Sequence, residues 1–113
     1  MPVSTFLIVA VLSAAGCRSG SKGTGPQLTA QQRRGQQIFQ ANCSVCHNAY
    51  KKEALQGPSL VHLYQKDLPS SGSPPTDQRV TETILMGRNM MPPFNMALEP
   101  QQVKDLIAYL HTL

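Results

Sequence analysis

The sequence predicts a small all-α fold of three to five helices. Helix-start signals precede two segments, and near the C-terminus four apolar residues repeat at the spacing of one helical face: Val103, Leu106, Ile107 and Leu110. No alternation of strand and helix patterns is visible along the chain. At 113 residues the chain forms one domain at most, with tails.

Composition excludes one class of partner and suggests a cofactor. The formal net charge is +4, but the basic residues are scattered and no aromatic residues alternate with them, so nucleic-acid binding is not expected. A domain this small buries little apolar surface, and a cofactor at its centre would supply much of the missing core. The scattered basic residues include Arg33, Arg34, Lys51, Lys52, Lys66, Arg79, Arg88 and Lys104.

The first residues carry an export signal. The apolar run over 6–12 is too short to span a bilayer but suits a signal peptide. The segment Ala14-Ala15-Gly16-Cys17 resembles the bacterial lipoprotein signal, although Ala14 stands where leucine is preferred and no Lys or Arg precedes the run. This resemblance implies a signal peptide over 1–16, a lipid on Cys17 and a flexible tether over 17–26. A plain secretory signal, or an uncleaved anchor, is the alternative.

The folded domain is expected to span 27–113 and to begin with a helix. Thr29 and Gln32 form a capping box for a helix that ends near Asn42. Gly35 and Phe39 share one face of that helix. A glycine inside a helix costs about 1 kcal/mol relative to alanine. Gly35 therefore predicts the close approach of a second helix.

Cys43-Ser44-Val45-Cys46-His47 has the pattern for covalent attachment of a c-type haem. Each thiol adds across one of two neighbouring porphyrin vinyl groups, and one short turn of chain matches their separation. His47 then supplies an imidazole nitrogen as an axial ligand of the iron. Two alternatives remain. A thiol–disulfide pair would sit in a βαβ pattern, and a zinc site would need a second pair of cysteines; neither feature is visible.

The chain resembles a class I c-type cytochrome over 27–113. The residues that carry the resemblance, in chain order, are Gly35 with Phe39, Cys43 with Cys46 and His47, Gly57-Pro58 with Leu60, Met91-Pro92-Pro93-Phe94, and Tyr109. The resemblance implies one covalently bound haem c wrapped by the helices, with the first and last helices crossing. It also implies that the Pro58 carbonyl accepts a hydrogen bond from the haem histidine, and that Leu60, Phe94 and Tyr109 belong to the haem pocket.

Two further helices are expected before the second iron ligand. A short one should cover Ser59–Lys66, and after a Ser/Gly/Pro-rich loop another should begin at Thr76 or Asp77 and stop at Gly87. A proline-rich segment follows, which suits a stiff loop that presents one side chain.

Three methionines of that segment could supply the sixth ligand of the iron. Met91 precedes a proline as in the family pattern and is the prediction, with Met90 and Met96 as alternatives. His62 could ligate in principle, but we assign it to the surface or the haem edge. The closing helix should start at Glu99 or Pro100, and His111 in its last turn should complement the helix dipole.

The predicted function is that of a one-electron carrier, not an enzyme. With protein ligands on both sides of the iron, no site remains for a small-molecule substrate. Redox proteins with acidic docking surfaces are the expected partners at the exposed haem edge, with Lys51 and Lys52 steering them. An extracytoplasmic location at a membrane follows from the export signal. The rivals are a haem with a labile sixth ligand that reacts with peroxide or a small gas, a thiol redox module, and a subunit of a larger oxidoreductase complex.

Overall fold

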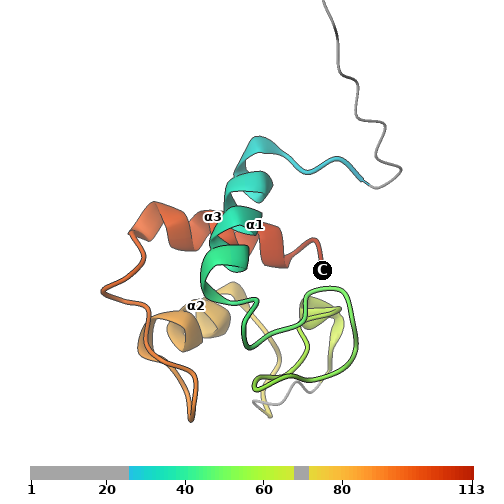
Figure 1. Cartoon of the computed structure of the whole chain (residues 1–113), viewed down its shortest axis with the longest axis vertical. Helices are drawn as coiled ribbons and strands as arrows, with labels where there is room; N and C mark the ends of the chain where they lie inside the picture. The colour runs from blue at the N-terminus through green and yellow to red at the C-terminus, as the bar shows by residue number, and fades with distance from the viewer. Residues whose placement is uncertain (1–25, 68–71) are drawn as a thin grey trace, which may run out of the picture.

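Three α-helices and one short 3-10 helix make up the folded part of the chain, shown in Figure 1 as a computed structural model that describes residues 26–67 and 72–113. In chain order they are α1 (Ala30–Asn42), η1 (Leu63–Gln65), α2 (Asp77–Met86) and α3 (Pro100–Leu110). Across these two ranges the chain forms no strand, and its extended backbone pairs only in an isolated bridge between Arg88 and Met91. The all-α prediction is confirmed.

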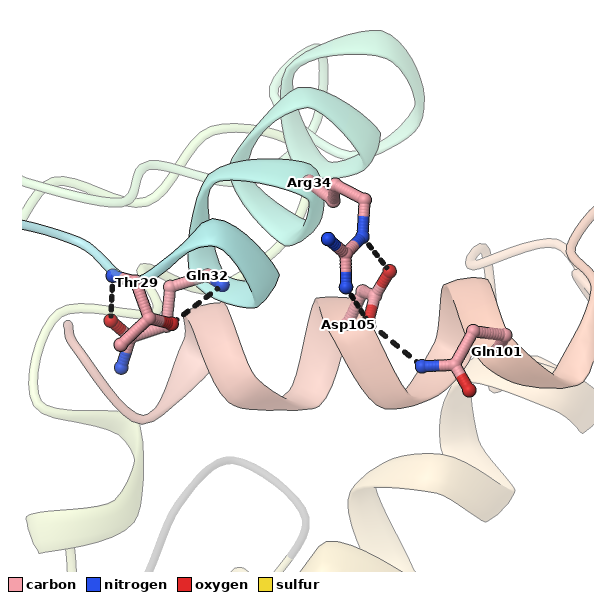
Figure 2. A network of polar contacts seen from close by, with 5 residues as sticks. All are labelled: Thr29, Gln32, Arg34, Gln101 and Asp105. Carbon is pink, nitrogen blue, oxygen red and sulfur yellow. Dashed lines mark hydrogen bonds and ion pairs between the residues drawn. The ribbon is translucent and has the colours of Figure 1, made fainter.

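Helix α1 begins where its capping box predicts. The Thr29 side-chain oxygen accepts a hydrogen bond from the Gln32 backbone nitrogen at 3.2 Å, and the Thr29 backbone nitrogen donates to the Gln32 side chain at 2.8 Å (Figure 2). Two backbone donors that the first helical turn leaves without partners are thereby satisfied. At its other end α1 leads directly into Cys43, whose backbone nitrogen donates to Phe39.

Helices α1 and α3 cross (Figure 1), and Gly35 lies at their contact, as the sequence predicts. A β-carbon added to Gly35 would overlap the backbone carbonyl oxygen of Asp105 and lie 2.7 Å from the β-carbon of Tyr109. Only a residue without a side chain therefore permits this separation of the two backbones. The close contact at Gly35 thus fixes the position of α1 relative to α3.

An ion pair fastens the same crossing. Asp105 is only 3% exposed, and its carboxylate accepts hydrogen bonds from Arg34 Nε at 2.8 Å and from Gln101 Nε2 at 3.0 Å (Figure 2). The Arg34 guanidinium holds the pKa of Asp105 below its usual value, so the carboxylate is ionised at neutral pH. A buried charge of this kind is tolerated because it is paired and fully hydrogen-bonded.

The core is built mainly from α3. Leu106 and Tyr109 are each 1% exposed, and the Tyr109 ring lies against that of Phe39 with 5.5 Å between centroids. The predicted apolar face of the last helix is confirmed, since all of its members are buried: Val103, Leu106, Ile107 and Leu110. Burial of this face against α1 and α2 is the main apolar contribution to the fold.

Helix α2 also agrees with its prediction. The side chain of Thr76 caps it by accepting from the Arg79 backbone nitrogen at 3.2 Å. The helix ends at Met86, and Gly87 follows with a positive φ of 72°, a conformation that glycine adopts without strain.

The prediction of a helix over Ser59–Lys66 is wrong except for its last turn. Only η1 is helical there, and His62 before it has a left-handed φ of 54°. In an α-helix over this range the Leu63 nitrogen would donate to the Ser59 carbonyl, but it donates to the Leu60 carbonyl at 3.0 Å, and the Ser59 carbonyl accepts from the Lys66 ammonium at 2.7 Å. The Ser59 hydroxyl and the Leu60 nitrogen also donate to the Lys51 and Asn48 carbonyls. Tertiary hydrogen bonds thus override the local preference.

His111 has side-chain partners that the dipole argument does not anticipate. It follows directly after α3, and its Nε2 lies 2.7 Å from a carboxylate oxygen of Asp77 at the start of α2. Its ring stacks on Tyr64 of η1, with 3.8 Å between centroids. The residue therefore joins three elements at the end of the last helix.

Candidate haem site

A largely apolar cavity of about 560 Å³ opens between the end of α1, the segment after it, α2 and α3. Its volume is in the range of cofactor and ligand sites in proteins. Phe39, Leu63, Ile84, Leu106 and Leu110 supply apolar walls from four elements. The predicted site residues that line this cavity are Cys43, Cys46, His47, Pro58, Leu60, Met91 and Phe94.

The cysteine motif forms one tight turn at the cavity. The backbone nitrogens of Cys46 and His47 both donate to the Cys43 carbonyl, at 3.1 and 2.9 Å. This turn follows α1 directly and brings both cysteines and the histidine to the same cavity. Burial, with a smaller effect of Cys46, raises the pKa of the Cys43 thiol to about 11. A thiol–disulfide module needs a reactive thiolate, whereas a thiol with a raised pKa stays protonated.

His47 is fixed by the turn that follows it in sequence. Its Nδ1 donates a hydrogen bond to the Pro58 carbonyl at 2.8 Å, which leaves Nε2 as the ring nitrogen that can bind a metal. Gly57 packs directly on the imidazole: a β-carbon there would overlap Cε1 and lie 2.8 Å from Nδ1. The Gly57 nitrogen in turn donates to the Cys46 carbonyl at 2.8 Å.

Met91 is presented by a loop that is fastened at both ends. Arg88 and Met91 exchange two backbone hydrogen bonds, at 3.1 and 2.9 Å, across a tight turn in which Asn89 has a φ of 53°. Beyond the prolines, the Phe94 nitrogen donates to the Ile84 carbonyl of α2 at 3.0 Å. Gly87 lies under the loop, where a β-carbon would come within 2.8 Å of the Pro93 nitrogen.

The alternative sixth ligands are placed differently. Met91 is half-buried and packs against the core, whereas Met90 lines the cavity but is 83% exposed, and Met96 is 93% exposed and does not line the cavity. His62 is exposed and does not line it either.

Tyr109 contributes to the cavity only through a neighbour. It does not line the cavity but packs behind Phe39, which does. Its hydroxyl lies 2.7 Å from that of Tyr50, and burial, helped by this contact, raises the pKa of Tyr109. Tyr50 also accepts a hydrogen bond from Gln36 at 3.2 Å, so the tyrosine pair ties the segment after the cysteine motif to both crossing helices.

Four residues of the site have no role in it that the sequence alone predicts. Gly57 helps to mark the family resemblance, but the sequence alone assigns it no contact of its own, although a glycine beside a proline can also mark a close approach. Lys66, Arg79 and Arg88 line the cavity together with the single carboxylate of Glu82. No local pattern distinguishes these cations from solvated ones, because the fold brings them together from separate elements.

The residues present fit a haem c. Two thiols lie on one turn beside an imidazole, a thioether lies on a second loop of the same cavity, and the cavity is lined by cationic residues of the kind that bind porphyrin carboxylates. A zinc site finds no support, since residues 26–67 and 72–113 contain no cluster of three or more His, Cys, Asp or Glu side chains that could hold a metal.

Comparison with known proteins agrees with this geometry. A family model described as cytochrome C oxidase, cbb3-type, subunit III matches residues 30–110. The chain is similar to cytochrome c6 of Nostoc sp. strain PCC 7120, with 33% identity over 77% of this chain and 75% of that protein. A cytochrome c-553-like protein of Synechocystis sp. is 36% identical over 71% of this chain and 67% of its own length.

The match to a subunit of a larger oxidase covers a smaller share of that relative's length. The cbb3-type cytochrome c oxidase subunit FixP of Azorhizobium caulinodans is 32% identical over 80% of this chain, which is 30% of FixP. No solved structure matches the chain. The cytochrome c6 matches favour an electron carrier over a subunit of a larger complex. The chain therefore belongs to the class I c-type cytochromes: it holds one covalently bound haem c and is a one-electron carrier rather than an enzyme.

Proposed function

We propose that this protein is an exported carrier whose haem is bound through thioethers to Cys43 and Cys46, with His47 and Met91 as the two axial ligands. The observation that carries the proposal is the single cavity that all four side chains line. Haem, when bound, supplies an iron that gains or loses one electron. The protein's part is to hold two ligands in place in both oxidation states, so that little rearranges on transfer.

Two contacts hold the histidine side of the site. The Pro58 carbonyl fixes the tautomer of His47, and Gly57 packs against its imidazole ring. A hydrogen bond of this kind makes Nε2 a stronger donor and holds the ring in one orientation. On the other side, a methionine thioether raises the reduction potential relative to a second histidine.

The mass of one peptide tests the attachment. Digestion of the mature protein should yield a fragment containing 43–47 that carries the mass of one haem and no free thiol. Haem that is extracted by acid acetone, with the fragment recovered unmodified, would contradict thioether bonds at these cysteines.

Transient redox proteins are the partners of this family, and we propose that they dock through acidic surfaces near Lys51 and Lys52. Both lysines are exposed just after the cysteine motif, and the Lys51 carbonyl accepts a hydrogen bond from Ser59 at 2.6 Å, which fixes that segment. Exposed charges of this sort act mainly on the rate of encounter.

Changing Lys51→Gln and Lys52→Gln together should slow electron transfer with an acidic partner by roughly threefold to tenfold at low ionic strength. Stopped-flow mixing at increasing salt should show the difference disappear, because salt screens exposed charges. Lys104→Gln is the control, since Lys104 is also exposed but lies on α3 and not beside the cysteine motif. Equal rates for the double variant and the control would remove the proposed role.

The anchor is proposed from the sequence. Cys17 and the segment over 1–25 lie outside the described residues, and among those described no helix is long and apolar enough to cross a membrane. We propose that a signal peptide over 1–16 is removed and that lipid on Cys17 tethers the domain over 27–113 to the outer face of a membrane, through 17–26.

A Cys17→Ser variant should then move from the membrane fraction to the periplasmic fraction while it keeps its haem. Fractionation with detection of haem measures this directly. An unchanged distribution between the fractions would show that Cys17 does not anchor the protein.

A further inference from the structure

The methionines of this chain are concentrated around one loop. Four of the five lie within 86–96. Met91 is half-buried against the core, whereas Met86, Met90 and Met96 are 73%, 83% and 93% exposed. Among residues 26–67 and 72–113, these three and Val45, which is 77% exposed within the cysteine motif, are the most exposed large apolar side chains. Packing against the core accounts for a methionine at position 91, but it does not account for the three exposed methionines.

The backbone holds these three residues around the Met91 loop. Met86 is the last residue of α2, and Met90 follows Asn89 in the tight turn that Arg88 and Met91 close. After the loop, the nitrogens of Phe94 and Asn95 donate to the carbonyls of Ile84 and Leu85, at 3.0 and 3.3 Å. The chain thus returns along the end of α2 just before Met96.

We propose that Met86, Met90 and Met96 are reversible oxidation sites that consume peroxide-class oxidants before these reach Met91. In the reaction the O–O bond of the peroxide breaks, one oxygen forms a bond to the thioether sulfur, and the other leaves as water. Sulfur loses two electrons and the peroxide gains them. Methionine sulfoxide reductases restore the thioether, so the sites can act repeatedly.

The exposure of each methionine side chain predicts the order in which the methionines are oxidised. A thioether open to solvent is reached by a dissolved oxidant far more often than one packed against the core. Oxidation of an exposed methionine leaves the fold intact because its side chain supports little packing. Oxidation of Met91 would place a polar group in the apolar cavity and remove the thioether. The inference goes beyond electron transfer and rests on the proposed function only for Met91 as a ligand.

The test uses the oxidised holoprotein and limiting amounts of hydrogen peroxide. Peptide mass spectrometry should find sulfoxide at Met86, Met90 and Met96 while Met91 is unmodified and the low-spin spectrum persists. In a triple variant with Met86→Leu, Met90→Leu and Met96→Leu, the fraction of Met91 oxidised by the same dose should rise by about threefold or more, because the three exposed methionines no longer consume the oxidant. Leucine keeps the volume and apolar character, so folding is not at risk.

A control variant separates sulfur chemistry from surface character. Leu55→Ala removes an exposed apolar side chain that carries no sulfur and should leave Met91 oxidation as in the wild type. Equal oxidation of Met91 and the three exposed methionines in the wild type, or equal Met91 oxidation in the triple variant and the wild type, would overturn the proposal. A low-spin spectrum that survives oxidation of Met91 would instead refute Met91 as a ligand, and the order of oxidation would still decide the protective role.

Discussion

Replacing Met91 with alanine should open one face of the haem. The variant should keep its covalent haem but lose the low-spin spectrum in favour of a high-spin one. Its reduction potential should fall by on the order of 0.1 V, a fraction of the about 0.8 V that axial ligands span. The physical reason is the loss of a soft donor that stabilises the reduced iron. Absorption spectroscopy and a redox titration measure the two effects.

Matched variants at the neighbouring methionines sharpen this prediction. Met90→Ala and Met96→Ala remove side chains that are almost fully exposed, so both proteins should keep the wild-type spectrum and potential. Should either control lose the low-spin state while Met91→Ala keeps it, the ligand would have to be reassigned.

Replacing Gly35 with alanine should destabilise the protein, against the trend for helices. Inside an exposed helix this change would stabilise by up to about 1 kcal/mol through backbone propensity. Here the new methyl group would overlap the Asp105 carbonyl oxygen and press on Tyr109, neither of which can move without shifting α3. Overpacking of this kind costs about 1–3 kcal/mol, so the net free energy of unfolding should fall. Denaturant unfolding of the holoprotein measures it.

Gln37→Ala provides the control on the same helix. Gln37 is exposed, and its change should alter stability by no more than a few tenths of a kcal/mol. The crossing of α1 and α3 would not be as tight as described if Gly35→Ala proved neutral or stabilising.

Local chemistry was sufficient to predict most of the helices. The Thr29 capping box, the Thr76 start of α2 and the proline at the start of α3 act within a few residues, so the sequence alone indicates them. Gly35 could be interpreted correctly because a glycine inside a helix has few explanations. The cysteine motif is equally local, since its spacing follows from the porphyrin.

Features that depend on distant partners could not be predicted. Hydrogen bonds from Ser59 and Leu60 to Lys51 and Asn48 hold that segment against the chain after the cysteine motif, and the left-handed φ of 54° at His62 interrupts the expected helix. Asp105 is a buried carboxylate among the apolar residues of α3, and its burial is explained only by the hydrogen bond from Arg34 on α1. The contact between Gly57 and the His47 ring likewise exists only in the folded chain. In each case the missing information is which two segments meet.

The account requires that the iron have no free coordination position. The absorption spectrum of the reduced protein before and after addition of carbon monoxide tests this most directly. With His47 and Met91 both bound, the spectrum should be low-spin and should not change with the gas. A shift to the spectrum of a carbon monoxide complex in the wild-type protein would show an open or labile sixth site, and would contradict a pure electron carrier.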